Sequence, residues 1–179
     1  MVNTPAAMII RPLAPGDAAA VAALHARAFG PGRFARTAYR VREGTPFSSP
    51  FCRVGALAND IVAAVRFTAI TIGGHHAALL LGPLAVDPAF ANQGYGRALV
   101  AQALQDARAA GIGLVLLVGD EPYYARLGFV RVPRGQVTLP GPVDPDRLLA
   151  AELKPGSLAA ASGAVAAASP VPAAPKGGA

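Results

Sequence analysis

Residues 84–118 constrain the fold more than any other part of the sequence, because two apolar runs flank a glycine-containing loop and a helix. The helix expected over 96–110 carries a single apolar stripe. The run LVLLV at 114–118 is apolar without interruption, which is typical of a strand buried on both faces. This succession of strand, loop, helix and buried strand indicates an α/β domain.

Turn residues divide the rest of the chain into short elements. Asn59-Asp60 and Gly73-Gly74 separate three strands expected over 53–58, 61–72 and 77–86, as in an antiparallel meander. Further elements are expected on either side: a strand at 8–12, a helix that Asp17 caps and Gly30 ends, a short helix around 33–42, a short helix from Pro122 to Gly128, and strands at 129–132, 136–139 and 148–153.

The length of 179 residues suits one domain followed by a tail. We expect the domain to span residues 8–155. Residues 156–179 are rich in Ala, Pro and Gly and lack the residues for a core, so we expect a flexible tail. An edge strand near 164–168 is the exception, and it could pair between subunits of a homodimer.

Composition excludes several classes of protein. The single cysteine, Cys52, excludes an internal disulfide framework and a cysteine-based zinc site. The longest apolar stretch, 77–86, is interrupted by Gly82 and Pro83 and falls short of the ~20 residues of a spanning helix. With no signal peptide recognisable at the start, we expect a cytoplasmic protein that does not contact membranes.

The formal net charge of +6 favours anionic partners without saying which. A GC-rich coding bias toward arginine explains the charge equally well. In the segment from Arg33 to Arg42, the arginines Arg33, Arg36, Arg40 and Arg42 are interleaved with Phe34 and Tyr39. A solvated helix face is the favoured interpretation. A nucleic-acid surface is disfavoured.

Glycines at the start of a helix let backbone N–H groups approach a phosphate, and the helix dipole favours its charge. Two familiar phosphate loops do not match here. A P-loop needs Lys and Ser or Thr after its last glycine, whereas Arg97 and Ala98 follow Gly96. A dinucleotide fingerprint needs a third glycine and a tight turn after the strand, and the sequence has neither.

A third pattern matches. Gln93-x-x-Gly96-x-Ala98, after a strand that ends at Val86, resembles the pyrophosphate loop of the GNAT superfamily of acyl-CoA-dependent N-acetyltransferases. The segment from Tyr124 to Phe129 resembles the second signature of that family, Tyr-x-x-x-Gly-Phe. The segments LLVGDEPYYARLGF and PGPVDPDRLLAAEL resemble the YhbS-like predicted acetyltransferases within the superfamily.

The resemblance implies an α/β GNAT fold: a mixed, mostly antiparallel sheet with helices on both faces and acyl-CoA between two splayed central strands. It implies transfer of acetyl from acetyl-CoA to a primary amine by direct attack in a ternary complex. Because the early helices of this family usually form a wall of the acceptor site, the resemblance also makes recognition of an acidic substrate a third interpretation of the segment from Arg33 to Arg42. By motif position Tyr124 is the general acid, with Tyr123 as its substitute. The residues implied for acetyl-CoA binding are Leu84, Ala85, Val86, Gln93, Gly94, Tyr95, Gly96, Arg97 and Ala98.

The general base is less well defined. Asp120 and Glu121 follow the buried strand, where family members often have asparagine, and either could take a proton from the incoming ammonium. The favoured interpretation of Asp120 is a carboxylate that caps the short helix. The spacing of the histidines indicates no metal site. The alternative to an enzyme is a non-catalytic acyl-CoA-binding or regulatory module.

Overall fold

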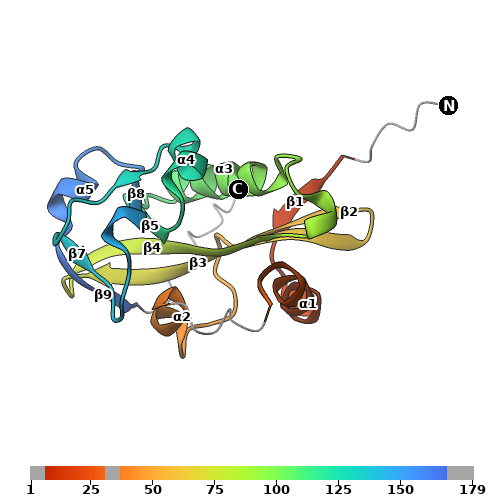
Figure 1. Ribbon diagram of the computed structural model, residues 1–179, viewed down its shortest axis with the longest axis horizontal. Coiled ribbons are helices and arrows are strands. Elements are labelled where there is room, and N and C mark those ends of the chain that lie inside the picture. The colour runs from red at the N-terminus through yellow and green to blue at the C-terminus, as the bar shows by residue number, and fades with distance from the viewer. Residues whose placement is uncertain (1–6, 31–36, 169–179) are drawn as a thin grey trace, which may run out of the picture.

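The computed structural model describes residues 7–30 and 37–168. Within them, a nine-stranded sheet has the order β1-β2-β3-β4-β5-β8-β6, with β9 beside β3 and β7 beside β9 (Figure 1). The strands are β1 (Ile9–Pro12), β2 (Arg53–Leu57), β3 (Asp60–Ile72), β4 (His76–Val86), β5 (Leu114–Val118), β6 (Val130–Arg131), β7 (Val137–Thr138), β8 (Leu148–Glu152) and β9 (Gly163–Ala167). Most neighbours run antiparallel, whereas β4 and β5 run parallel. The expected mixed, mostly antiparallel sheet is confirmed.

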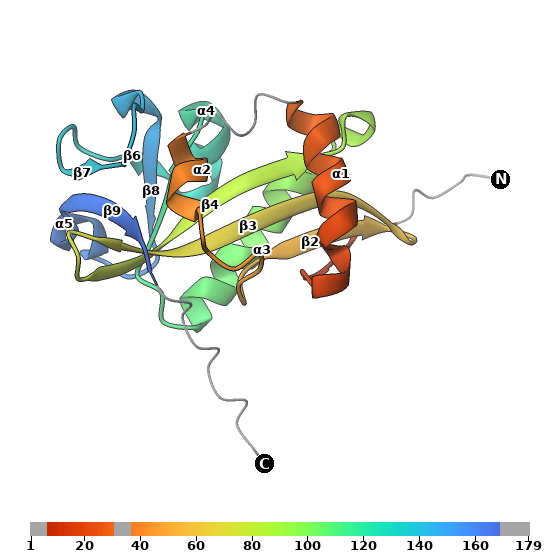
Figure 2. The same ribbon diagram turned by 90° about the horizontal axis from the view of Figure 1, so that it is seen from below.

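Helices cover both faces of this sheet, as expected. The helices are α1 (Ala18–Phe29), α2 (Thr37–Arg42), α3 (Tyr95–Ala109), α4 (Glu121–Tyr124) and α5 (Ser157–Ala160). Figure 1 shows α3 on one side of β3 and β4, and α1 and α2 on the other. Figure 2, seen from below, places α1 and α2 in front of the sheet and α3 behind it.

The alternation of side chains along β3 explains the two layers of core. Ala63, Val65 and Phe67 belong to the cluster that packs against α3. The residues between them point the other way, so that Ala64 packs with α1 and Ile70 packs with Val41 of α2. Each face of the strand therefore has its own helical cover.

The two central strands separate along their length. β4 and β5 are paired only at Leu79–Val115 and Leu80–Leu116. Beyond this point β4 continues beside β3 while β5 continues beside β8. A register shift opposite Gly82 and Pro83 marks where β4 departs. This separation is the splay that the family resemblance implies.

The C-terminal part of the fold extends beyond the domain boundary expected at residue 155. Helix α5 and strand β9 follow that boundary, and Ala161 and Val165 are buried in the core. The strand expected near 164–168 exists, but it links β3 to β7 of the same chain and is not an edge left free for a second subunit. The tail from residue 169 lies outside the described residues.

Two local expectations are corrected. Asp17 does not cap α1, since its carboxylate binds Arg11 at 2.6 and 2.8 Å and accepts the Ala14 N–H. The strands expected at 129–132 and 136–139 shrink to β6 and β7. Helix α2 begins at Thr37, and residues 33–36 lie outside the described residues. None of the described helices has the length and hydropathy to cross a bilayer.

Candidate functional site

The N-terminus of α3 supplies backbone N–H groups directed out of the fold. Gly94 has φ 81° at the N-cap, a left-handed conformation that favours glycine. The first helical hydrogen bond runs from the Ala98 N–H to the Gly94 carbonyl at 3.0 Å. The amides of Tyr95, Gly96 and Arg97 precede that bond and have no partner within the helix. Together with the helix dipole, they form a receptor for an anion.

These amides face a pocket of about 510 Å³ between the loop before α3 and the start of α4. Its lining is Val86, Phe90, Ala91, Asn92, Gln93, Gly94, Tyr95, Gly96, Arg97, Pro122, Tyr123 and Arg126. Arg97 and Arg126 bring two positive charges, and no carboxylate is among these lining residues. Both the amides and the side chains therefore favour a negatively charged ligand.

Gly96 is required by the close approach of Tyr123. A Cβ atom built on Gly96 would lie 2.7 Å from the Tyr123 hydroxyl oxygen and 3.3 Å from a methyl group of Val86. The absence of a side chain thus lets the wall formed by α4 approach the first turn of α3. Burial raises the pKa of Tyr123, and the nearby Arg97 opposes that shift.

The splay next to this pocket exposes the free edge of β4. The Asp87 N–H donates to the Val62 carbonyl of β3 at 2.8 Å. Because successive amides of a strand point to opposite edges, the Val86 and Leu84 N–H groups point away from β3, toward the splay. They are placed to donate to an extended ligand or to a carbonyl oxygen that lies there.

Tyr124 lies behind the pocket wall, against the core. Its ring contacts that of Phe129 edge-on with centroids 5.7 Å apart, and that of Tyr123 with centroids 4.8 Å apart. A Cβ atom on Gly119 would lie 2.6 Å from the Tyr124 ring, so β5 and this ring are in close contact. Burial, reinforced by the neighbouring Tyr123 and Asp120, raises the pKa of Tyr124 to about 12. The phenol therefore stays protonated at neutral pH.

The two acidic residues after β5 are paired with arginines. Asp120, whose side chain is 77% exposed, lies 3.3 Å from Arg147. It makes no side-chain cap, which corrects the capping interpretation; its backbone carbonyl accepts from the amides of Tyr123 and Tyr124 instead. Glu121 accepts a hydrogen bond of 2.6 Å from Arg131.

The structure gathers most of the sequence-predicted residues in one place. Val86, Gln93, Gly94, Tyr95, Gly96 and Arg97 line the pocket. Three others stand beside it: Leu84 packs against the α3 cluster, Ala85 is buried against α1, and Ala98 uses its N–H inside the helix. Tyr124, Asp120 and Glu121 do not line the pocket.

Sequence reasoning missed Phe90, Asn92 and Arg126 as lining residues. Asn92 has φ 61°, an uncommon conformation for a residue other than glycine, and it shapes the loop. Arg126 lies inside the Tyr-x-x-x-Gly-Phe motif, three residues after Tyr123. That spacing of about one helical turn would have indicated that Arg126 lies on the same pocket wall as Tyr123.

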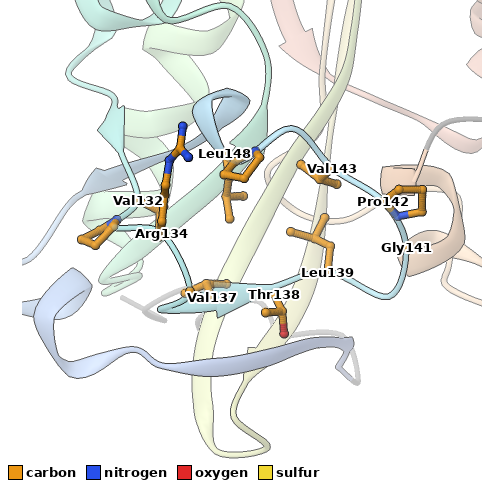
Figure 3. A pocket seen from close by; sticks show the side chains of 12 residues that line it. Val132, Arg134, Val137, Thr138, Leu139, Gly141, Pro142, Val143 and Leu148 are labelled. Atoms are coloured by element: carbon orange, nitrogen blue, oxygen red, sulfur yellow. The ribbon is translucent and has the colours of Figure 1, made fainter.

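A second pocket of about 320 Å³ lies between β7, the start of β8 and the loop that joins them (Figure 3). Figure 3 shows Val137, Leu139, Val143 and Leu148 around it, with Arg134 at one side. Arg134 is paired with Asp146 at 2.9 Å. The pocket is mainly apolar and carries no group of acyl-transfer chemistry. Among residues 7–30 and 37–168 no cluster of His, Cys, Asp and Glu could hold a metal ion.

Comparison with known proteins agrees with this geometry. Residues 52–131 match the family model of the acetyltransferase (GNAT) domain. The uncharacterized N-acetyltransferase YhbS of Escherichia coli is 31% identical over 127 residues, which cover 68% of this chain and 73% of that protein.

Solved structures share the fold. The crystal structure of E. coli YhbS in complex with CoA superposes with a TM-score of 0.80 at 24% identity, covering 94% of this chain and 93% of that one. A GNAT acetyltransferase of Brucella melitensis in complex with acetyl-CoA gives a TM-score of 0.60 at 26% identity, covering 81% and 96% of the two chains. The chain belongs to the GNAT family of acetyl-CoA-dependent N-acetyltransferases.

Proposed function

We propose that this protein transfers the acetyl group of acetyl-CoA to a primary amine by direct attack in a ternary complex. The observation that supports this best is the coincidence of two features. The anion receptor at the start of α3 adjoins the place where β4 and β5 separate. A phosphate-bearing thioester with an amide-rich arm is complementary to this combination.

The donor site in this proposal is formed by the residues around the first turn of α3. The amides of Tyr95, Gly96 and Arg97 hold the pyrophosphate, and Arg97 and Arg126 add charge-assisted hydrogen bonds. Gln93 and Gly94 shape the loop. The pantetheine arm extends along β4 beside Leu84, Ala85 and Val86, where the Leu84 and Val86 N–H groups point to the splay. The Val86 N–H then polarises the thioester carbonyl.

The chemical step uses a tyrosine as acid. The amine nitrogen forms a bond to the thioester carbon, and the carbon–sulfur bond breaks. Tyr124 donates its phenolic proton to the departing thiolate, and its raised pKa ensures that the proton is present. Before attack, the acceptor ammonium loses one proton to water or to Asp120, the more exposed of the two acidic candidates; Glu121 accepts a hydrogen bond from Arg131. As the amide forms, the nitrogen loses its second proton, which restores the phenol of Tyr124.

The test separates donor binding from turnover. Saturating acetyl-CoA should raise the melting temperature, with NAD as the control ligand. At one hundred times the dissociation constant, linkage gives about 2.7 kcal/mol of stabilisation. Tyr124→Phe should keep this shift and lose turnover about 100-fold or more in a CoA-release assay with an amine panel.

Two results would contradict the proposal. The absence of a shift at millimolar acetyl-CoA would remove the donor site. A shift without CoA release from any amine, in wild type and Tyr124→Phe alike, would favour the non-catalytic acyl-CoA-binding module.

A further inference from the structure

The face of the sheet opposite α3 carries a polar cluster between the cores of α1 and α2. By the alternation along β3, Arg66 and Thr68 point to this face, between Ala64 and Ile70. Arg42, the last residue of α2, reaches the same region, where its terminal nitrogen would lie 2.9 Å from a Cβ atom on Gly82. Gly82 marks the place where β4 leaves β5. The cluster therefore adjoins the splay.

Two polar atoms in this cluster are buried and lack hydrogen-bond partners among the described residues: Arg42 Nε and Thr68 Oγ1. Thr68 is 5% exposed. A buried polar group without a partner costs about 1–3 kcal/mol, so two of them on one face are unusual in a folded protein. The hydrogen-bonding capacity of one guanidinium N–H and one hydroxyl is thus unused among the described residues.

The cluster also carries positive charge at Arg42 that no carboxylate of residues 7–30 and 37–168 neutralises. All ten Asp and Glu residues of the sequence lie in the described ranges, and none of them forms an ion pair with Arg42. Burial and the neighbouring charge of Arg66 lower the pKa of Arg42 to about 9. An anion bound here would offset both the desolvation cost of the buried Arg42 charge and its repulsion by Arg66.

Arg66 is held in position beside Arg42. Its guanidinium donates to the Pro46 carbonyl at 3.0 Å and lies 5.3 Å from the centre of the Phe47 ring. Both arginines keep part of their surface exposed, so a ligand in solution has access to them. Two guanidinium groups and a hydroxyl are suited to the oxygens of a carboxylate or a phosphate.

We propose that Arg42, Arg66 and Thr68 bind an anionic group, a carboxylate or a phosphate, on the acceptor, so that the substrate class is amines that carry such a group near the reacting nitrogen. This inference rests on the proposed acetyl transfer. The end of α2 and the middle of β3 then set specificity for the acceptor, while the loop before α3 binds the donor.

The experiment compares amines in matched pairs that differ in the anionic group. Suitable pairs are β-alanine with β-alaninamide and O-phosphoethanolamine with ethanolamine, each assayed by CoA release. Wild type should prefer the anionic member of at least one pair about tenfold or more in kcat/KM, and the preferred pair distinguishes carboxylate from phosphate. Arg42→Gln should raise KM for that member about 10- to 100-fold with little change for the neutral member.

Matched variants separate recognition from structure. Arg40→Gln removes an exposed arginine from the same helix and should behave as wild type. Thr68→Val keeps the shape of the side chain, deletes the hydroxyl and should weaken the preference. Arg42→Lys keeps the positive charge but lacks the planar guanidinium, so it should show a stronger preference for the anionic amine than Arg42→Gln and a weaker one than wild type. Each variant must retain the shift in melting temperature with acetyl-CoA, which shows that it is folded.

A binding measurement covers the case in which no amine in the panel is acetylated. Succinate and inorganic phosphate are titrated into the CoA-saturated protein, with succinamide as the neutral control. Tighter binding of either anion to wild type than to Arg42→Gln supports the inference even without turnover. Equal kcat/KM within every pair, or equal anion affinity of wild type and Arg42→Gln, overturns it. Failure of acetyl-CoA to bind would instead remove the acetyl-transfer proposal.

Discussion

At the scale of single residues, the site depends on how closely two walls approach each other at Gly96. The Tyr123 hydroxyl occupies the space where a side chain on residue 96 would begin. Tyr123 and the residues of the first α3 turn thereby become opposite walls of the same pocket.

Gly96→Ala should therefore weaken acetyl-CoA binding without unfolding the protein. The added methyl group displaces the Tyr123 ring toward the phosphate position, and we expect a tenfold increase in Kd, or about 1.4 kcal/mol, by calorimetric titration. Ala101→Ser, on the exposed side of α3, is the control. The double variant Gly96→Ala/Tyr123→Phe removes the clashing oxygen and should recover affinity; failure to recover would mean that the contact with Tyr123 is not the cause.

The phenol of Tyr124 should ionise at a higher pH than an ordinary tyrosine. Burial raises its pKa to about 12, against an ordinary value of 10. In an absorbance titration, the difference between wild type and Tyr124→Phe should have its midpoint near pH 12. The folded-state pKa is raised, so the associated stability is present below pH 10 and is lost as the pH rises through 12. A difference curve centred at pH 10 would contradict the buried position of the ring.

Residue-level prediction from the sequence succeeded where the determinants are local. Gln93, Gly94 and Gly96 lie within one loop and one helix turn, so their pattern identifies the pocket directly. It failed for Asp17 and Asp120, because the arginine partners of both carboxylates are not indicated by capping rules. It also missed the cluster of Arg66 and Thr68, since their strand alternation looks like that of any core strand.

At the scale of elements, the position of α3 is tied to the meander by one ion pair. Arg53 of β2 is 8% exposed and donates to Asp106 of α3 at 2.6 and 3.0 Å. It also donates to the carbonyls of Pro50 and Cys52. This contact joins the helix that carries the anion receptor to β2, which lies two places from β4 in the sheet.

Asp106→Asn should destabilise the fold through that contact. The substitution leaves the buried Arg53 without a carboxylate, and because Asp106 is partly exposed we expect a loss of about 2 kcal/mol, between the values for surface and buried pairs. Thermal unfolding should show a fall of roughly 4–8 °C for a chain of this size. Asp60→Asn, at an exposed strand start, should change the melting temperature little. Equal effects of both substitutions would show that the ion pair contributes nothing.

The long elements were predictable because their periodicity is strong. The helix expected over 96–110 and the strand at 114–118 agree with α3 and β5 to within one residue at each end. The lengths of β6 and β7 were overestimated, because the extent of each strand depends on its pairing with β8 or β9 rather than on its own sequence.

At the scale of the whole molecule, β9 closes the far end of the sheet. It pairs with the last residues of β3 along one side and with β7 along the other, and the Gly163 N–H donates to the Gln136 carbonyl at 2.8 Å. Its alanine-rich sequence carries almost no signal of this role, because one buried side chain, Val165, does most of the packing. The sequence analysis accordingly placed the domain boundary before α5, and only the tertiary contacts of Val165 and Ala161 include these residues in the core.

Val165→Ala should measure how strongly β9 supports the rest of the fold. Val165 is 4% exposed and packs with Ile70, Ile72 and Ala161, so loss of two methyl groups in this core should cost about 2 kcal/mol. Ala166→Ser on the exposed side of the same strand is the control. Because the polar cluster of Arg42, Arg66 and Thr68 lies on the same face of β3, a loosened β9 should lower acceptor preference before it lowers acetyl-CoA affinity. Denaturant unfolding, acceptor preference and acetyl-CoA affinity are therefore measured on this one variant. Wild-type stability would mean that β9 does not support the rest of the fold. Lowered stability together with a lowered acceptor preference would mean that β9 is a structural support of the acceptor face.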